Sequence, residues 1–314
     1  MNVIYNYAAG PEFEARLARL RAEGLAVDVC PESDDARLFR LLANADVLWH
    51  CLRPVDRALL DAAPKLKLVQ KIGVGVNTID LEHAKKRGVA VCNMPGTNSA
   101  AVAEHTLALM LAVLRQVRRF DADVRGARGW SWAAARQDRL GEIAGRTVGL
   151  VGFGGIPRLL APILTAMGAR VVYTARTPKP EVPYPHLALD ALLAASDIVS
   201  LHVPATLETQ RLLDRARIAR MKPGAIVVNT ARGALLDEDA LCDALALGRL
   251  GGAGLDVFAV EPTPPIHRLF ERDDVVLTPH IAWLTRETLE RSIDVAVDNC
   301  RRLANAQTLR FRVA

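Results

Sequence analysis

Short apolar runs alternate with amphipathic stretches over residues 1–98. Apolar residues recur at helical spacing in stretches such as Glu12–Glu23 and Leu81–Arg87, whereas the runs between them are too short for helices. The predicted strands are Val3–Tyr5, Asp46–Trp49, Leu68–Lys71 and Val89–Cys92. Strands that alternate with helices are typical of a parallel sheet covered on both faces, so this segment is predicted to be an α/β domain.

A second alternating unit begins near Thr147. Its predicted strands are Val148–Val151, Arg170–Tyr173, Ile198–Leu201, Ala225–Val228, Ala253–Asp256 and Val275–Leu277. The helix predicted before this unit, from Ser99 to about Gln116, is too apolar for a surface and is expected between domains or at a subunit contact. A last helix, Thr285–Leu303, is expected to return to the first domain.

The pattern therefore predicts two α/β domains with doubly wound parallel sheets, the first of them discontinuous. Residues 1–98 and 286–314 would form one domain and residues 99–285 the other, with the two chain crossings acting as a hinge. The chain has 314 residues, of which 51% are hydrophobic and 24% charged. That length allows two separate cores, and the composition is ordinary for a globular enzyme.

Composition excludes several classes of protein. No apolar run reaches the roughly 18 residues of a membrane span, and the N-terminus lacks the pattern of a signal peptide, so no membrane is expected. The net charge of +5 is mild and the arginines are spread over many predicted helices, which argues against nucleic-acid binding and suits small anionic ligands.

Metal binding is not expected either. The five cysteines are scattered without metal-ligand spacing and fit a reducing cytoplasm: Cys30, Cys51, Cys92, Cys242 and Cys300. The acidic run Asp237-Glu238-Asp239 is expected to cap the helix that follows it rather than to bind a metal. The chain is thus predicted to be cytoplasmic and without a metal site.

A glycine turn, Gly152–Ile156, joins a predicted strand to the start of a helix. In such turns backbone amides and a helix N-terminus face the pyrophosphate of a dinucleotide. Pro157 stands where a third glycine is usual, and proline is tolerated in the first turn of a helix. A second strand that ends about 20 residues later favours a Rossmann-type nucleotide site over a plain tight connection.

The second strand of this unit is followed by Ala175-Arg176-Thr177. NAD-binding units usually place Asp or Glu at this position to hold the ribose hydroxyls. Ala175 leaves space and Arg176 supplies positive charge, which together suit the 2′-phosphate of NADP. NADP(H) is therefore the expected cofactor, and NAD(H) remains possible.

Arg232, Glu261 and His280 each lie shortly after a predicted buried strand. Ligands of open α/β sheets bind beyond the carboxyl ends of the strands, so the three side chains are expected at one rim. The set suits hydride transfer at a carbonyl. The guanidinium would hold and polarise an oxo acid, the imidazole would move the proton, and the carboxylate would tune the imidazole.

Further motifs run over nearly the whole chain. They are Gly73-Val-Gly75-Val-Asn77-Thr-Ile-Asp80, Asn98-Ser-Ala-Ala-Val-Ala-Glu104-His-Thr106, Ser196-Asp-Ile-Val-Ser-Leu-His202-Val-Pro204-Ala-Thr206 and Met221-Lys-Pro-Gly224. With these motifs the chain resembles the D-isomer-specific 2-hydroxyacid dehydrogenase family. The resemblance implies a flavodoxin-like substrate domain, a Rossmann dinucleotide-binding domain, a cleft between them and a homodimer formed through the NAD(P)-binding domain. It also implies hydride transfer between NADP(H) and C2 of a small 2-oxo or 2-hydroxy acid of D configuration.

The resemblance assigns substrate holding to Arg232, acid/base catalysis to His280 and the carboxylate partner to Glu261. It further implies that the amides of Val74 and Gly75 meet the substrate carboxylate. Its cofactor-binding positions are Thr106, Gly152, Phe153, Gly154, Gly155, Ile156, Ala175, Arg176, Thr177, Val203, Pro204, Thr230, Ala231 and Asp256, of which Asp256 would meet the nicotinamide carboxamide. The stretches Tyr173–Thr177 and His280–Trp283 look most like those of glyoxylate/hydroxypyruvate reductases. Gly155 departs from the family, which commonly has a long basic side chain there.

Several side chains keep two interpretations. Lys71 could assist the substrate carboxylate or be solvated, Trp283 could close the substrate pocket or pack the hinge, and His50 could line the cleft or be structural. The two tryptophans Trp130 and Trp132 could reach a neighbouring subunit or pack in a core or interface.

Two rival functions also stay open. The first is phosphite oxidation, a reaction carried out by relatives that have the same Arg, Glu and His set. A nucleotide-sensing co-repressor of this fold would carry long disordered tails, which this sequence lacks, and that interpretation is not favoured.

Overall fold

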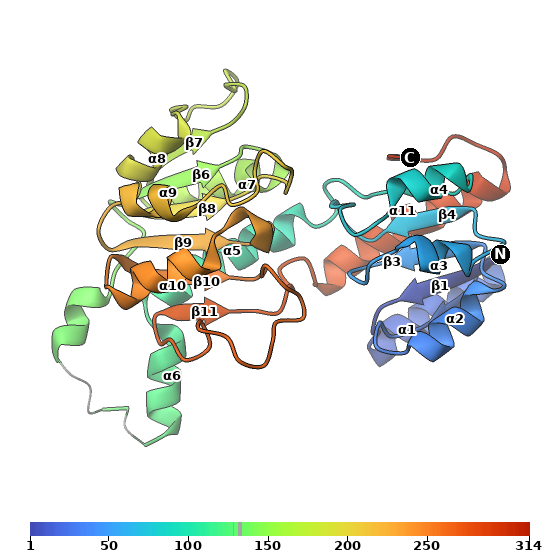
Figure 1. Ribbon diagram of the computed structural model, residues 1–314, viewed down its shortest axis with the longest axis horizontal. Helices are drawn as coiled ribbons and strands as arrows, with labels where there is room; N and C mark the ends of the chain where they lie inside the picture. The colour runs from blue at the N-terminus through green and yellow to red at the C-terminus, as the bar shows by residue number, and fades with distance from the viewer. Residues whose placement is uncertain (128, 131–133) are drawn as a thin grey trace. The chain divides into compact units, whose positions relative to one another are not determined.

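The computed structural model describes residues 1–127, 129–130 and 134–314, so Trp132 lies outside the described residues. The chain divides into two units (Figure 1). Unit 1 comprises Met1–Asn98 and Thr285–Ala314, and unit 2 comprises Ser99–Leu284. The boundaries expected from the sequence differ from these by one residue, at the second crossing. Each unit is built on its own parallel sheet and is described by itself.

Unit 1 holds five strands in the order β2-β1-β3-β4-β5. The strands are β1 (Asn2–Asn6), β2 (Ala26–Val29), β3 (Val47–His50), β4 (Leu68–Lys71) and β5 (Ala90–Cys92); the helices are α1 (Pro11–Arg19), α2 (Asp35–Leu42), α3 (Arg57–Asp61), α4 (Leu81–Lys86) and α11 (Arg286–Ala304). This is the strand order of a flavodoxin-like sheet, which confirms the fold predicted for this unit. The strand that the pattern did not predict, β2, is a partly buried edge strand with little apolar alternation.

The two faces of this sheet are covered by different helices, because successive side chains of a strand point to opposite faces. Ile4 and Val69 bury in one cluster with residues of α2, α3 and α4. Gln70 faces the other way and accepts a hydrogen bond of 2.6 Å from the Asn299 amide of α11. The last helix thus packs on the first unit, as the pattern predicted.

Unit 2 holds six strands in the order β11-β10-β9-β8-β6-β7. The strands are β6 (Thr147–Val151), β7 (Arg170–Thr174), β8 (Ile198–Leu201), β9 (Ala225–Asn229), β10 (Leu250–Leu255) and β11 (Val275–Leu277); the helices are α5 (Ser99–Leu114), α6 (Val117–Arg125), α7 (Gly155–Ala166), α8 (Leu189–Ala195), α9 (Arg215–Arg220) and α10 (Glu238–Ala246). A parallel bridge between Tyr173 and His186 adds a position beyond β7. With that bridge the order is the Rossmann order 3-2-1-4-5-6 with one further strand, and it reverses between β6 and β8.

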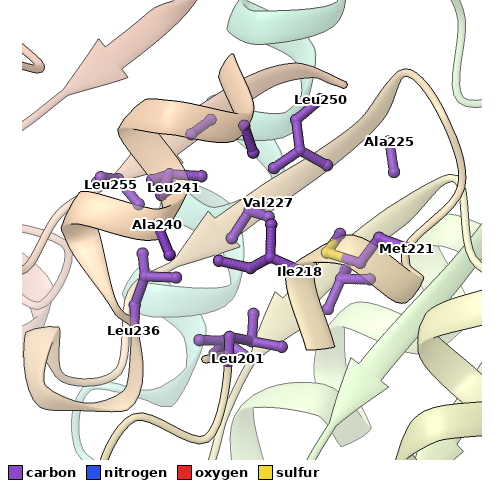
Figure 2. Close-up of a cluster of buried hydrophobic side chains, with 14 of the residues drawn as sticks. Leu201, Ile218, Met221, Ala225, Val227, Leu236, Ala240, Leu241, Leu250 and Leu255 are labelled. Carbon is purple, nitrogen blue, oxygen red and sulfur yellow. The ribbon is translucent and has the colours of Figure 1, made fainter. Parts of the chain in front are cut away.

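Two apolar clusters cover the sheet of unit 2. Figure 2 shows the first, in which Ile218 of α9 and Leu241 of α10 bury with Val227 of β9. The second contains Val228, which points to the opposite face, together with residues of α5 and α7. Helices on both faces leave the carboxyl ends of the strands as the rim where loops can build a site.

The apolar helix α5 packs against β9, β10 and α7 within unit 2. Two glycines of β10 allow this close approach, since a Cβ at Gly252 would lie 2.6 Å from Val113 and one at Gly254 would lie 2.9 Å from Leu109. Burial inside one unit therefore accounts for the composition of α5. The sequence pattern predicts α5 between domains or at a subunit contact, but its packing within unit 2 explains its apolar composition without either contact.

Among the described residues, no single helix has both the length and the apolar composition needed to cross a membrane. The helices α5 and α6 meet that test only as a pair, and they are bent by 63° at their junction.

Candidate active site

The glycine turn lies after β6, at the point where the strand order of unit 2 reverses. Gly152 has a φ of 97°, and a Cβ there would lie 2.6 Å from the carbonyl oxygen of His202, so only glycine suits this position. Gly154 is the N-cap of α7, and no side chain caps the helix. Pro157 is the third residue of α7, where a backbone N–H has no partner within the helix, and its ring is buried.

The uncapped start of α7 is the feature that fits a dinucleotide. Its first amides, those of Gly155 and Ile156, are N–H donors at the positive end of a 12-residue helix. A Cβ at Gly154 would meet nothing within 4 Å, so the backbone there is open to a ligand. Among the predicted cofactor-binding residues, Phe153 packs against Tyr173 with ring centroids 4.5 Å apart. Val203 abuts Gly152, and Pro204 is exposed next to it.

The residues after β7 are Ala175, Arg176 and Thr177, and they are partly or fully exposed. The backbone of Ala175 is in contact with the side chain of His186, whose Nε2 lies 3.1 Å from the Ala175 carbonyl oxygen. No carboxylate occupies the position that would bind ribose hydroxyls in an NAD-binding unit. The structure therefore places an exposed arginine, Arg176, directly after a strand end that carries no carboxylate.

Arg232 lies in a turn that follows β9. The buried Asn229 braces this turn, because its amide donates to the Arg232 carbonyl at 2.8 Å and its oxygen accepts from the Ala231 amide at 3.0 Å. Gly233 begins a 3-10 helix, Gly233–Leu235. A Cβ at Gly233 would lie 1.9 Å from the carbonyl carbon of Phe258, so this turn is in backbone contact with the segment that carries Glu261.

Glu261 and His280 form a close pair. The Nδ1 atom of His280 lies 2.6 Å from one carboxylate oxygen of Glu261, and the other oxygen accepts from the Phe258 amide at 2.8 Å. Burial opposes ionisation of Glu261, but the His280 bond, the Phe258 amide and the charge of Arg232 lower its pKa below the ordinary value. Burial also lowers the pKa of Arg232, an effect that the charge of Glu261 opposes. The three residues predicted to act together thus interact within unit 2.

Asp256 holds the His280 loop in place. Asp256 is fully buried, and its Oδ1 accepts from the Thr278 hydroxyl at 2.6 Å and from the Ile281 amide at 2.9 Å. Its Oδ2 accepts from the Ala282 amide at 2.9 Å, and its carbonyl accepts from the His280 amide at 2.7 Å. These donors flank His280 on both sides and stabilise its left-handed backbone, with a φ of 55°. The contact of Asp256 with a nicotinamide carboxamide stays a prediction.

Helix α5 is hydrogen-bonded to the loop that carries His280 and to the turn that carries Arg232. His105 Nε2 donates to the Thr278 hydroxyl at 2.9 Å, since that hydroxyl gives its own proton to Asp256. The next residue, Thr106, donates to the Val102 carbonyl at 2.7 Å and lies 2.8 Å from the Thr230 hydroxyl. Thr106 and Thr230 are buried, so their observed role is to join α5 to the Arg232 turn, and their contact with a cofactor stays a prediction.

Three predicted substrate-site residues lie in unit 1. Lys71, at the end of β4, is 6% exposed and donates to the Cys51 carbonyl, so the interpretation that it is solvated is wrong. Val74 is exposed, and its carbonyl accepts from the Asn93 amide at 2.9 Å, while Gly75 is half-buried. Their roles toward a substrate stay predictions.

His50 and Trp283 have structural contacts that the sequence left open. His50 is fully buried, and its Nε2 lies 2.9 Å from the Thr78 hydroxyl. Burial, with the charge of Lys71, lowers its pKa well below the ordinary value, so it stays neutral. Trp283 is buried and its indole donates to the His280 carbonyl at 3.0 Å, which anchors the acid/base loop. Trp130 is 95% exposed.

The supporting residues Asn229, Gly233, Thr278 and His105 were not predicted from the sequence. The signal closest to them is the glycine directly after Arg232, since a glycine next to a functional residue often marks a close approach of two backbones. The other three act through hydrogen bonds to loops, and those contacts depend on loop conformations that no sequence spacing shows.

The chain is similar in sequence and in structure to known proteins of one family. The model of the D-isomer specific 2-hydroxyacid dehydrogenase NAD binding domain matches residues 107–282. D-3-phosphoglycerate dehydrogenase of Mycobacterium leprae is 42% identical over 269 residues, which are 84% of this chain and 50% of that protein. Hydroxypyruvate reductase of Thermotoga maritima is 38% identical over 258 residues, which are 81% of this chain and 83% of that protein. The crystal structure of the TT0316 protein of Thermus thermophilus is similar at a TM-score of 0.91 and 42% identity, covering 100% of both chains. The chain spans about half the length of the phosphoglycerate dehydrogenases that it matches.

Proposed function

This chain belongs to the D-isomer-specific 2-hydroxyacid dehydrogenase family, and from that membership and the geometry of unit 2 we propose that it is a 2-oxo acid reductase. In the proposed reaction, glyoxylate or hydroxypyruvate, NADPH and one proton give the 2-hydroxy acid and NADP⁺, with D configuration where C2 is chiral. The observation that carries the proposal is the 2.6 Å bond between His280 and Glu261, within the electrostatic reach of Arg232.

Each of the three residues has a distinct task. Glu261 engages Nδ1 of His280, so Nε2 is the ring nitrogen that gives a proton to the carbonyl oxygen of the substrate. The carboxylate of Glu261 accepts from Nδ1 and so orients the ring with Nε2 free to face the substrate. Arg232 offers a planar fork that can bind a carboxylate and a carbonyl oxygen together. NADPH, when bound along the glycine turn, supplies the hydride that adds to C2 of the substrate.

The proposed substrate is small. Support comes from the hydroxypyruvate reductase relative, of which this chain covers 83% at 38% identity. Lys71, Val74, Gly75 and Trp283 stay the proposed substrate-binding residues, Val74 and Gly75 from the resemblance, Lys71 from its positive charge at the end of β4 and Trp283 from its place directly after the acid/base loop. Phosphoglycerate dehydrogenases are also close relatives, so a phosphorylated 2-oxo acid is the natural competitor in any assay.

A substrate screen tests the proposal. We expect the highest kcat/KM for glyoxylate or hydroxypyruvate, measured against pyruvate, 3-phosphohydroxypyruvate and, in the oxidative direction, phosphite. Preference for 3-phosphohydroxypyruvate or turnover of phosphite alone would replace the proposed substrate. Binding of the dinucleotide without turnover of any 2-oxo acid would instead favour a nucleotide-sensing protein.

We propose NADP(H) as the preferred cofactor. Ala175 leaves space where a carboxylate would repel a 2′-phosphate, and the exposed guanidinium of Arg176 follows it. One charge-assisted hydrogen bond contributes about 1.5–3 kcal/mol, which corresponds to about 10- to 100-fold in affinity. Wild-type enzyme should therefore prefer NADPH over NADH by at least ~10-fold in kcat/KM.

The double variant Ala175→Asp/Arg176→Ala should shift that preference toward NADH. Arg170→Ala is the matched control, because Arg170 is an exposed arginine at the opposite end of the same strand, β7. The control should keep the wild-type preference. A wild-type enzyme that prefers NADH would refute the proposal.

Arg232→Lys should lower kcat and raise KM for the oxo acid. A lysine ammonium is a point charge and cannot bind two oxygens in one plane as a guanidinium does. We expect kcat/KM for the oxo acid to fall at least ~10-fold, the loss of about one charge-assisted bond. Arg220→Lys, a change at an exposed ion pair with Asp190, is the control. Unchanged kinetics in Arg232→Lys would show that Arg232 is structural.

We further propose a cytoplasmic homodimer formed through unit 2. The five cysteines are buried and unpaired, which supports a reducing compartment. Helix α6 buries none of its residues and exposes Val117 and Val124, which supports a second copy as its partner. A sedimentation mass of one chain at micromolar concentration would rule out the dimer.

A further inference from the structure

We propose that Glu238 is a positioning residue for Glu261, because it ties both ends of the segment Ala259–His267 to the first turn of α10. The proposal rests on the proposed function, in which Glu261 orients His280. The acidic run around Glu238 was expected only to cap a helix, and that cap is formed by its neighbour Asp237, whose carboxylate accepts from the Ala240 amide at 3.0 Å. The carboxylate of Glu238 is therefore available for other partners.

Glu238 binds the two ends of the segment with its two oxygens. Its Oε1 accepts from the Ala259 amide at 2.7 Å, and its Oε2 lies 3.2 Å from Nε2 of His267. The Leu269 amide donates to Nδ1 of His267 at 3.3 Å, so the ring proton lies on Nε2 and is donated to Glu238. The imidazole also packs against Phe270, with ring centroids 5.4 Å apart, which limits its rotation.

The segment needs such a support because it has no helix or strand of its own. Val260 and Ile266 are exposed, so its apolar side chains bury little surface. In the described part of unit 2, and apart from bonds to close neighbours in sequence, the segment is joined to the rest by the two bonds to Glu238 and by the bond between Glu261 and His280. Without Glu238, the position of Glu261 would depend on its bond to the nearby Phe258 amide and on the bond to His280 that it is meant to direct.

The helix that carries Glu238 is itself packed into the core of unit 2. Helix α10 is anchored through Ala240 and Leu241, which are buried in the apolar cluster on the sheet (Figure 2). On its other side the segment begins at Phe258, whose backbone touches Gly233 in the turn that carries Arg232. Glu238 therefore fixes Glu261 relative to the same sheet that carries Arg232 and His280.

A carboxylate is required at this position because two donors converge on it. A glutamine offers one oxygen, and its NH₂ group would face the N–H of His267 or of Ala259. The Glu238 side chain is 14% exposed, so water replaces a lost partner poorly. Both Glu238→Ala and Glu238→Gln should therefore loosen the segment, the second without a cavity.

The test is a double-mutant cycle in kcat for the oxo acid. Displacing a catalytic group slightly costs up to about 100-fold, so we expect Glu238→Ala to lower kcat by about 10-fold, with KM for NADPH unchanged. In an enzyme that already carries Glu261→Gln, the same change should have little further effect, because its action runs through Glu261. Glu238→Gln should behave in the same way.

Asp239→Ala is the matched control, since Asp239 is the next carboxylate of α10 and its side chain is 83% exposed. It should leave kcat unchanged. Hydrogen exchange of peptides covering residues 258–269 should be at least ~10-fold faster in Glu238→Ala than in Asp239→Ala, which reports the loosening without any activity.

Equal losses of kcat in the wild-type and Glu261→Gln backgrounds would overturn the proposal, as would wild-type kcat in both Glu238 variants. If Glu261→Gln itself has wild-type kcat, the proposed function fails at Glu261. The support by Glu238 is then decided by hydrogen exchange alone, and unchanged exchange over residues 258–269 would reject it.

Discussion

Replacement of His280 by alanine should lower kcat for oxo-acid reduction by at least ~100-fold, because a positioned acid contributes about 10² to 10⁴-fold. The variant loses the ring that Glu261 and the Asp256-braced loop hold in place. Affinity for NADPH should change little, since the glycine turn and the residues after β7 are untouched. Steady-state kinetics together with a fluorescence titration of NADPH measure the two quantities separately.

His83→Ala is the control for this change. His83 in unit 1 lies 2.7 Å from Asp61, which makes a pair of the same kind without a neighbouring catalytic set. It should keep wild-type kcat. A His280→Ala enzyme with kcat near that of the wild type would show that another group supplies the proton.

Gly233→Ala is expected to abolish most activity with a single added methyl group. The new Cβ would lie 1.9 Å and 2.0 Å from the carbonyl carbon and oxygen of Phe258, which are backbone atoms and cannot rotate away. The Arg232 turn and the Glu261 segment must therefore move apart, and a displacement of about 1 Å at a catalytic group can cost about 100-fold in rate. Overpacking should also lower the free energy of unfolding by about 1–3 kcal/mol.

Gly10→Ala is the matched control, because a Cβ at Gly10 meets nothing within 4 Å. It should leave both kcat and thermal stability near their wild-type values. Measurement of kcat and Tm in the two variants decides the matter. If Gly233→Ala retained wild-type kcat, the two catalytic loops would not depend on this contact.

The three catalytic candidates could be predicted from the sequence because each follows a buried parallel strand. Strands of a parallel sheet end at the same rim, so Arg232, Glu261 and His280 had to lie on one side of it. Both fold predictions were confirmed for the same reason, since apolar runs that alternate with helices leave few other architectures. The edge strand β2 was not predicted because its apolar alternation is weak. The apolar composition of α5 is explained by its packing within unit 2.

The hydrogen bonds that hold the site could not be predicted in this way. Asp256 was assigned to a nicotinamide by resemblance, which stays a prediction, and its carboxylate is seen to bind the Thr278 hydroxyl before the acid/base residue and the Ile281 and Ala282 amides after it. Glu238 was read only as part of a helix cap. Both roles depend on which backbone amides approach a carboxylate, and that depends on loop conformation rather than on spacing in the sequence.

The central claim is that hydride passes from NADPH to C2 of a 2-oxo acid to give the D-hydroxy acid. The most direct test is reduction of hydroxypyruvate with NADPH that carries deuterium at the transferable position of the nicotinamide ring, followed by chiral analysis and mass spectrometry of the glycerate. We predict D-glycerate with one deuterium on C2. L-glycerate, or glycerate without deuterium, would contradict the account.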